Sequence, residues 1–288
     1  MLYFKVLGPL EIDTADGKTQ VRGVLQRKLL RTLLIKSSEL VPSEALINEL
    51  WGEEHPERVE NALQAHISRI RRRLSSLEPE RAASRLRTHI SGYQLMVAED
   101  EVDALWFLSS LERIRGRLDE DLPAAIRDLR AILDAWRSPV LPEGEGGVIC
   151  KAAVSQYEES RLLAIETLFD AELRVGNHAG IVGELRGTLS RDRFHERFWQ
   201  QLMTALYRSG RQSEALAAYQ QLRRRLNDEL GLEPSPSTSA FEQAILSHNP
   251  LLSLSSGAEI ALAAAAPEPT AIDRWSSDGD PARHLSRR

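Results

Sequence analysis

The apolar pattern of this chain changes once, near residue 100, and the change restricts the fold to two unlike parts. Residues 3–12 are rich in aromatic and β-branched residues, and residues 18–22 follow a turn signal at Asp16-Gly17. This pattern predicts a strand, a hairpin turn and a returning strand. From residue 103 to about 247, strand signals are absent and Leu, Ala, Arg and Glu dominate, which predicts an all-helical region. The length of 288 residues allows two domains of ordinary size.

The first part also contains three helical segments and a second hairpin. Leucine side chains recur at helical spacing over residues 24–36, and Ser43 can cap a second helix over 43–51. A third helix is predicted over 57–77, followed by two short apolar runs that form a hairpin over 86–97. The order of sheet, three helices and hairpin is that of a winged helix-turn-helix domain preceded by a small sheet. The predicted fold is therefore α+β over residues 1–98.

The formal net charge of −5 conceals two regions of opposite sign. Residues 1–98 contain 15 basic and 12 acidic residues, whereas residues 99–288 contain 22 basic and 30 acidic residues. Within the first region, residues 61–97 contain seven Arg and two Glu. An acidic protein with one basic segment can bind nucleic acid through that segment alone.

The helix over 57–77 has one apolar face and one polar face. The apolar positions share a helical stripe and are predicted to face the core: Leu63, Ile67, Ile70, Leu74 and Leu77. The opposite face carries side chains that can contact bases or phosphates: Asn61, Gln64, Ser68, Arg69 and Arg72, flanked by Arg71 and Arg73. Amide and guanidinium groups can bind adenine and guanine edges, and flanking Arg can bind phosphates. No acidic residue interrupts this face after Glu60, so DNA reading is favoured over a merely solvated Arg-rich face.

Two neighbouring segments are further candidates for contacts. The hairpin carries side chains that could reach phosphates or the minor groove: Arg85, Arg87, Thr88 and His89. Arg87 is the best single candidate, and a purely structural hairpin is an equal alternative. The loop over 52–56 is partly acidic and is predicted to be exposed, with Glu53, Glu54 and His55 at its centre; a plain connection is the alternative there.

A repeat is visible in the helical region. Gly176 and Gly210 are 34 residues apart, which is the tetratricopeptide period. Around the two glycines, four of five compared positions keep an apolar residue. Helix hairpins of this kind bury their apolar faces by stacking, so the sequence predicts a tetratricopeptide-like helical domain over 103–248. Beyond it, residues 250–288 are rich in Ser, Gly, Ala and Pro, and a disordered tail is expected.

The sequence lacks the patterns that enzymes and membrane proteins require. The seven His residues show no metal-ligand spacing, the nucleotide-binding motif G-x-x-x-x-G-K-[ST] is absent, and no nucleophile motif stands out. We therefore expect no catalytic activity, no cofactor and no metal. Cys150 is the single cysteine, which excludes an internal disulfide and favours a reducing cytoplasm. No apolar run is long enough to span a membrane.

Two long motifs resemble a known family. The segment SEALINELWGEEHPERVENALQAHISRIRRRL, followed by LRTHISGYQL, resembles the OmpR-type winged-helix domain. Together with ALYRSGRQSEALAAYQQLRRRLNDELGLEPSPS, it resembles the SARP family (Streptomyces antibiotic regulatory proteins) over about residues 3–248. These proteins join the winged helix to a bacterial transcriptional activator domain built from tetratricopeptide-like helices.

The resemblance implies a transcriptional activator of a secondary-metabolite gene cluster. It implies binding to direct repeats in promoter DNA near the −35 region, side-by-side self-association on those repeats, and recruitment of RNA polymerase with its sigma factor. The helix over 57–77 would be the recognition helix, with Asn61, Gln64, Ser68, Arg69 and Arg72 as base or phosphate contacts. The hairpin over 86–97 would be the wing, and the loop over 52–56 a polymerase contact. The protein would be cytoplasmic and associated with the nucleoid when bound.

Two other functions remain open from the residues alone. The helical repeats could form a protein-interaction scaffold along a concave surface, with the N-terminal domain only assisting. The chain could also be a ligand-sensing regulator with an accessory DNA-binding domain.

Overall fold

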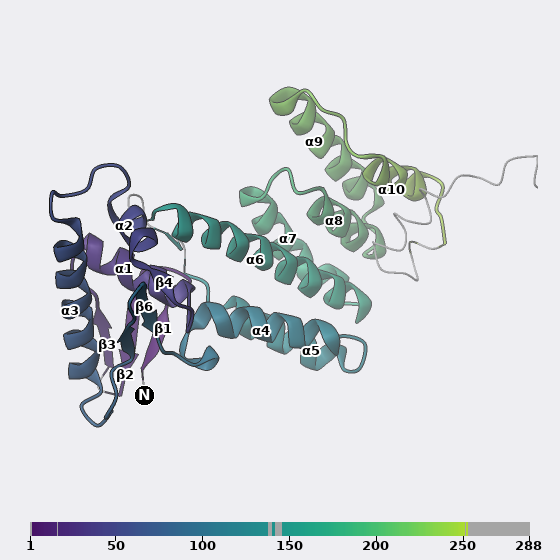
Figure 1. Ribbon diagram of the computed structural model, residues 1–288. Coiled ribbons are helices and arrows are strands. Elements are labelled where there is room, and N and C mark those ends of the chain that lie inside the picture. The colour runs from purple at the N-terminus through teal and green to yellow at the C-terminus, as the bar shows by residue number, and fades with distance from the viewer. Residues whose placement is uncertain (1, 16, 138–139, 142–145, 251, 253–288) are drawn as a thin grey trace, which may run out of the picture. The chain divides into compact units, whose positions relative to one another are not determined.

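The computed structural model describes residues 2–15, 17–137, 140–141, 146–250 and 252 (Figure 1). The chain divides into two compact units, Met1–Ala171 and Glu172–Arg288. Apart from residues 250 and 252, the expected tail lies outside the described residues. Among the described helices, none combines the length and the apolar character needed to cross a membrane.

The first sheet of unit 1 has three antiparallel strands in the order β1 (Tyr3–Lys5), β2 (Glu11–Thr14) and β3 (Gly17–Gln20). The prediction of one strand over residues 3–12 is wrong, because the chain leaves the sheet after β1. The amides of Val6 and Leu7 donate to the Asp103 carboxylate instead, at 2.7 and 3.2 Å. A side chain almost a hundred residues away therefore ends the strand.

Three helices follow, close to their predicted positions: α1 (Val24–Ile35), α2 (Ser43–Trp51) and α3 (Val59–Leu77). The prediction of Ser43 as a side-chain cap is wrong. Ser43 is the first residue of α2, Pro42 occupies the capping position, and no side chain caps this end. The backbone amide of Ser43 donates to the carbonyl of Ser91 at 3.0 Å, so α2 begins at the second sheet.

The second sheet confirms the predicted hairpin and adds a strand. Its order is β4 (Val41–Pro42), β6 (Gly92–Leu95) and β5 (Leu86–Thr88), all antiparallel. The two-residue strand β4 was not predicted, because so short a segment has no periodicity. A Cβ atom on Gly92 would lie 2.0 Å from the carbonyl oxygen of Val41, so β4 and β6 can pair only if this position is glycine.

A short 3-10 turn, η1 (Glu99–Glu101), leads into the helices α4 (Asp103–Gly116), α5 (Leu122–Leu133) and α6 (Val148–Arg174). Most of α6 belongs to unit 1, so this unit combines the winged helix with the first helices of the all-helical region. Asp121 caps α5 by accepting the amide proton of Ala124 at 3.0 Å. Between α5 and α6, residues 138–139 and 142–145 lie outside the described residues.

Glu49 joins α2 to the start of α6. Its carboxylate accepts hydrogen bonds from the amides of Gly147, Ile149 and Cys150, at 2.9, 2.7 and 3.0 Å. The first amides of a helix have no intrahelical acceptor, and a negative charge there also interacts favourably with the helix dipole. Since the Glu49 residue is only 2% exposed, these amides donate their hydrogen bonds to the carboxylate instead of to water.

The described residues of unit 2 form four further helices, α7 (His178–Arg191), α8 (Glu196–Arg208), α9 (Gln212–Leu230) and α10 (Pro236–Leu246). The 34-residue repeat is confirmed in the backbone. Gly176 and Gly210 follow α6 and α8 with φ of 87° and 75°, a left-handed conformation that favours glycine. The apolar residues after each glycine, such as Ile181 and Ala215, are fully buried.

Replacing Glu49 by Gln tests the junction between α2 and α6. The substitution keeps the shape but removes the charge and one acceptor oxygen, so we expect a loss of about 2 kcal/mol in the free energy of unfolding. Urea denaturation followed by circular dichroism measures it. The matched control is Glu44→Gln on the exposed side of α2, expected to cost less than about 0.5 kcal/mol. Equal effects of the two substitutions would contradict the role of Glu49.

Candidate nucleic-acid interface

Helix α3 packs through a single apolar stripe. Its buried residues are Val59, Leu63, Ile67, Ile70 and Leu74, and Leu77 is half-buried. This confirms the predicted core face. The stripe places α3 along one side of unit 1 (Figure 1).

From Asn61 onward, the opposite face of α3 is exposed and carries only neutral and basic side chains. The exposed candidates are Asn61, Gln64, Ser68, Arg69, Arg72 and Arg73. The sequence has no acidic residue between Asn61 and Leu77. A helix of this kind can enter the major groove with amide and guanidinium groups directed at base edges.

Arg71 and Arg73 differ from the other candidates because both also bind within the protein. The half-buried Arg71 donates to the carbonyl of Leu86 at 3.2 Å and to the hydroxyl of Thr88 at 2.6 Å, which ties α3 to β5. Arg73 donates to the hydroxyl of Thr19 on β3. Their guanidinium groups thus fix the position of α3 against both sheets while adding positive charge beside its exposed face.

The wing hairpin presents a basic strand and an exposed tip. Arg87 and Thr88 on β5 are exposed, as is His89. His89 bonds Gln94 across the hairpin at 3.0 Å, and Gln94 donates to the carbonyl of Ser38 at 2.6 Å. Ile90 at the tip is fully exposed. Hydrogen bonds of His89 and Gln94 therefore stabilise the wing. Arg87 lies on its surface.

Arg85 is not part of this surface, so its prediction as a wing contact is wrong. The residue is 3% exposed and makes ion pairs with both Glu78 and Glu101, each with a 2.7 Å hydrogen bond from Nη2. Its guanidinium also lies 5.9 Å from the ring centre of Phe4. Hydrogen bonds from Arg85 hold the pKa of both carboxyls below the ordinary value. Two acidic partners on either side of the wing in the sequence, 7 and 16 residues from Arg85, draw this arginine into the core.

The loop between α2 and α3 is exposed throughout. Gly52 follows α2 with φ of 62°, and the next three residues, Glu53, Glu54 and His55, all face solvent. The loop lies beside the first turn of α3, at the opposite end of that helix from the Arg73–Thr19 hydrogen bond.

His66 makes a polar contact from α3 to α1 and a ring contact to α2. Its Nδ1 lies 2.6 Å from the amide nitrogen of Gln26 on α1, and its ring centre lies 5.9 Å from that of Trp51 on α2. Burial lowers the pKa of His66, and the nearby Arg69 lowers it further. The imidazole is thus favoured in its neutral form, which can accept a hydrogen bond from Gln26.

Comparison with known families assigns both parts of the chain. Residues 23–95 match the family described as transcriptional regulatory protein, C terminal. Residues 102–246, half of the chain, match the bacterial transcriptional activator domain.

Full-length relatives extend this match. The transcriptional regulator RedD of Streptomyces coelicolor is 36% identical over 252 residues, covering 87% of this chain and 72% of RedD. The regulatory protein DnrI of Streptomyces peucetius is 35% identical over 254 residues, covering 86% of this chain and 93% of DnrI. The chain belongs to the SARP family.

A solved structure supports the same fold for this SARP-family chain. Mycobacterium tuberculosis EmbR, in complex with a low affinity phosphopeptide, superposes with a TM-score of 0.81 at 28% identity. The superposition covers 92% of this chain and 69% of the EmbR chain. The winged helix followed by a helical domain is therefore the fold of a transcriptional regulator.

In the described residues, no three His, Cys, Asp or Glu side chains are grouped as a metal site would need. Cys150 is fully buried, its sulfur lies 3.5 Å from the Thr32 hydroxyl, and burial raises the pKa of the thiol to about 12. A thiol in this state is a poor nucleophile.

Sequence reasoning missed the residues that position α3 and the wing. Glu49 and Asp103 act through partners about a hundred residues away, and Arg85 acts through carboxylates 7 and 16 residues away. The only available signal was their charge, and charge alone does not distinguish a buried ion pair from a solvated side chain.

Replacing Arg85 by Met tests the buried ion pairs. Glu78 and Glu101 would then face each other without the buried guanidinium that pairs with both, so we expect a loss of about 3 kcal/mol in the free energy of unfolding at about pH 7. In the wild type the lowered pKa values mean that the stabilisation is present at neutral pH and is lost as the pH falls through those values. In the variant the pKa values of Glu78 and Glu101 rise, so these carboxyls become protonated, and cease to repel each other, at a higher pH. The difference in unfolding free energy between the wild type and the variant therefore narrows towards about pH 4.5.

Urea denaturation at the two pH values measures this difference. Arg87→Met, at an exposed position on β5, is the matched control and should change stability by less than about 0.5 kcal/mol at both. A difference for Arg85→Met that does not depend on pH would rule out the electrostatic account.

Proposed function

We propose that the chain is a sequence-specific transcriptional activator of a secondary-metabolite gene cluster and that α3 is its recognition helix. The observation that supports this most directly is the exposed face of α3, which joins amide, hydroxyl and guanidinium groups and has no acidic residue after Glu60. The membership of the SARP family supports the regulatory role. The proposed function requires no catalytic step.

In this proposal, α3 lies in the major groove of promoter DNA. Asn61 and Gln64 contact base edges from the first turns of the helix, where an amide can pair with adenine. Arg69 and Arg72 contact guanine or phosphates further along the same face, and Ser68 is small enough to allow close approach. Because guanidinium groups displace counterions from phosphates, binding depends strongly on salt.

The wing supplies a second contact with the same DNA. Arg87 reaches the phosphates or the minor groove, and Thr88 is held beside it by the hydrogen bond from Arg71. Arg71 and Arg73 act by positioning α3 against the sheets and by adding charge near the phosphates. The two elements thereby bind one half-site as a single body.

We further propose that two copies bind direct repeats side by side and recruit RNA polymerase with its sigma factor. Direct repeats require a head-to-tail arrangement, because a two-fold symmetric dimer matches an inverted repeat. The exposed loop with Glu53, Glu54 and His55 is the candidate polymerase contact. The helical domain would stabilise the pair on DNA.

Alanine substitutions on α3 test the recognition helix. Promoter fragments selected from the host genome by the purified protein provide the target. Arg69→Ala and Arg72→Ala should each weaken binding by about tenfold or more. Each should reduce the slope of log affinity against log salt by about 1 where the side chain binds phosphate. Gln64→Ala should relax the preference for one base pair and leave the slope unchanged.

The matched control for these variants is Arg115→Ala, which removes the same charge from an exposed position on α4. Its affinity and salt slope should equal those of the wild type. If the Arg69 and Arg72 variants also bind as the wild type does, α3 is not the recognition helix.

The arrangement of copies is tested with paired sites. We expect two copies to bind cooperatively to two direct repeats and to lose that cooperativity when one repeat is inverted. Mobility-shift titrations at a stated salt concentration measure both. A stable symmetric dimer that binds only inverted repeats would contradict the head-to-tail proposal.

A further inference from the structure

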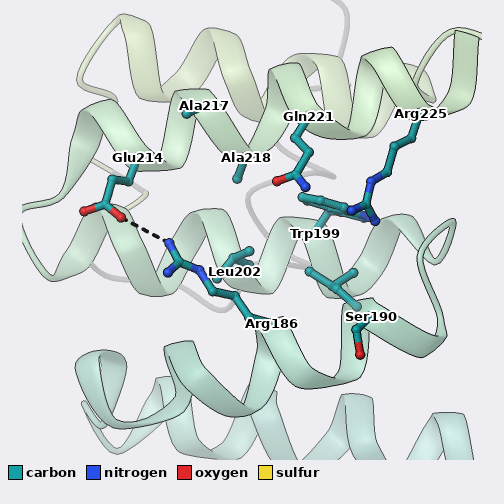
Figure 2. Close-up of a pocket in the computed structure, with 10 residues that line it drawn as sticks. Arg186, Ser190, Trp199, Leu202, Glu214, Ala217, Ala218, Gln221 and Arg225 are labelled. Atoms are coloured by element: carbon teal, nitrogen blue, oxygen red, sulfur yellow. Dashed lines mark hydrogen bonds and ion pairs between the residues drawn. The ribbon is translucent and has the colours of Figure 1, made fainter. Parts of the chain in front are cut away.

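A pocket of about 350 Å³ lies in unit 2, outside the proposed DNA interface. Figure 2 shows Trp199 and Leu202 of α8 between residues of α7 and α9. Arg186 and Ser190 come from α7, and Glu214, Ala217, Ala218, Gln221 and Arg225 come from α9. Its volume is within the range of small-molecule sites.

The floor of this pocket is apolar. Trp199, Leu202, Leu189 and Ala218 line it and are each less than 10% exposed. The indole Nε1 of Trp199 donates to the carbonyl of Arg193 at 2.9 Å, so the polar edge of the ring is already satisfied. Ala217 at the mouth is exposed and small, so its side chain does not close the pocket.

The charges around the pocket favour an anion. The lining contains two arginines and one acidic residue. Glu214 pairs with Arg186 at 3.1 Å and also with Arg211 at 2.7 Å, so its single negative charge is shared. In the described part of the chain, Arg225 has no carboxylate partner, and its guanidinium lies 5.5 Å from the ring centre of Trp199. An arginine held on an aromatic ring at the mouth of an apolar pocket is positioned to bind a carboxylate.

The ion pair between Arg186 and Glu214 limits the shape of the occupant. It runs from α7 to α9 across α8 and is drawn as the dashed line in Figure 2. An extended chain or a helix lying along the groove would have to break this bridge, whereas a compact ligand beside Trp199 leaves it intact.

We propose that this pocket binds a small organic carboxylate with a flat apolar group. The apolar group lies on Trp199, Leu202 and Ala218, and the carboxylate binds the guanidinium of Arg225, with the Gln221 amide as a further donor. Such a site would make the helical domain a ligand sensor in addition to its part in activation.

Two matched probes test the charge requirement. Indole-3-acetate carries an aromatic group and a carboxylate, and indole-3-acetamide has the same shape without the charge. We expect the acid to bind at least tenfold more tightly than the amide when both are titrated against the full chain by saturation-transfer NMR. Equal binding of the two probes, or no transfer to either at millimolar concentration, would overturn the proposal.

Substitutions then locate the site. Arg225→Gln should weaken indole-3-acetate at least tenfold, and Ala217→Phe should abolish its binding by filling the mouth. The matched control is Arg224→Gln, one residue earlier on the exposed side of α9 and outside the pocket, which should leave binding unchanged. Equal losses in Arg224→Gln and Arg225→Gln would indicate general charge attraction and would overturn the assignment.

Further measurements separate loss of the site from loss of the fold. Circular dichroism and thermal unfolding identify a variant that has lost its fold, and the promoter affinity of Arg225→Gln without ligand should equal that of the wild type.

The binding of indole-3-acetate is also compared with that of an acetylated Asp-Trp dipeptide amide. Tighter binding of the dipeptide than of the free acid would assign the pocket to a peptide and overturn the small-molecule proposal.

Discussion

The burial of two carboxylates holds unit 1 together. The Glu49 carboxylate accepts hydrogen bonds from three backbone amides at the start of α6. The Asp103 carboxylate accepts hydrogen bonds from the amides of Val6 and Leu7 beside β1. Each joins backbone segments about a hundred residues apart in the chain. Burial raises the pKa of Asp103 to about 6, although its hydrogen bonds act in the opposite direction. A buried amide without an acceptor costs free energy. These amides find their acceptors only when the winged helix packs against α4–α6, so the two parts form one compact unit.

The proposed recognition surface depends on this frame. The apolar stripe of α3 sets which face is exposed, while Arg71, Arg73 and His66 fix the helix against the wing, the first sheet and α1. Arg85 secures the base of the wing through two buried ion pairs. A DNA-reading helix must be held rigidly if its side chains are to meet particular base edges. Some arginines on and beside α3 therefore position the helix, whereas others supply positive charge at its surface.

Local and periodic features were predictable from the sequence. The three helices, the wing hairpin, the buried stripe of α3 and the glycine repeat all depend on residues close together in the chain. The single strand over 3–12, the cap at Ser43 and the exposure of Arg85 were predicted wrongly. Each of these depends on a partner that local periodicity does not specify: Asp103 for the strand, Ser91 for Ser43, and Glu78 with Glu101 for Arg85.

The sequence by itself determined the winged-helix order, the outward face of α3 and the stacked helices with their matched glycine turns. Those features follow from side-chain periodicity and from the backbone freedom of glycine, which are properties of short segments. Only the tertiary structure decided which charges are buried and which amides they bind, and that the Trp199 pocket forms between α7 and α9. Burial and ion pairing arise when distant segments meet, and a residue's type does not specify its partner.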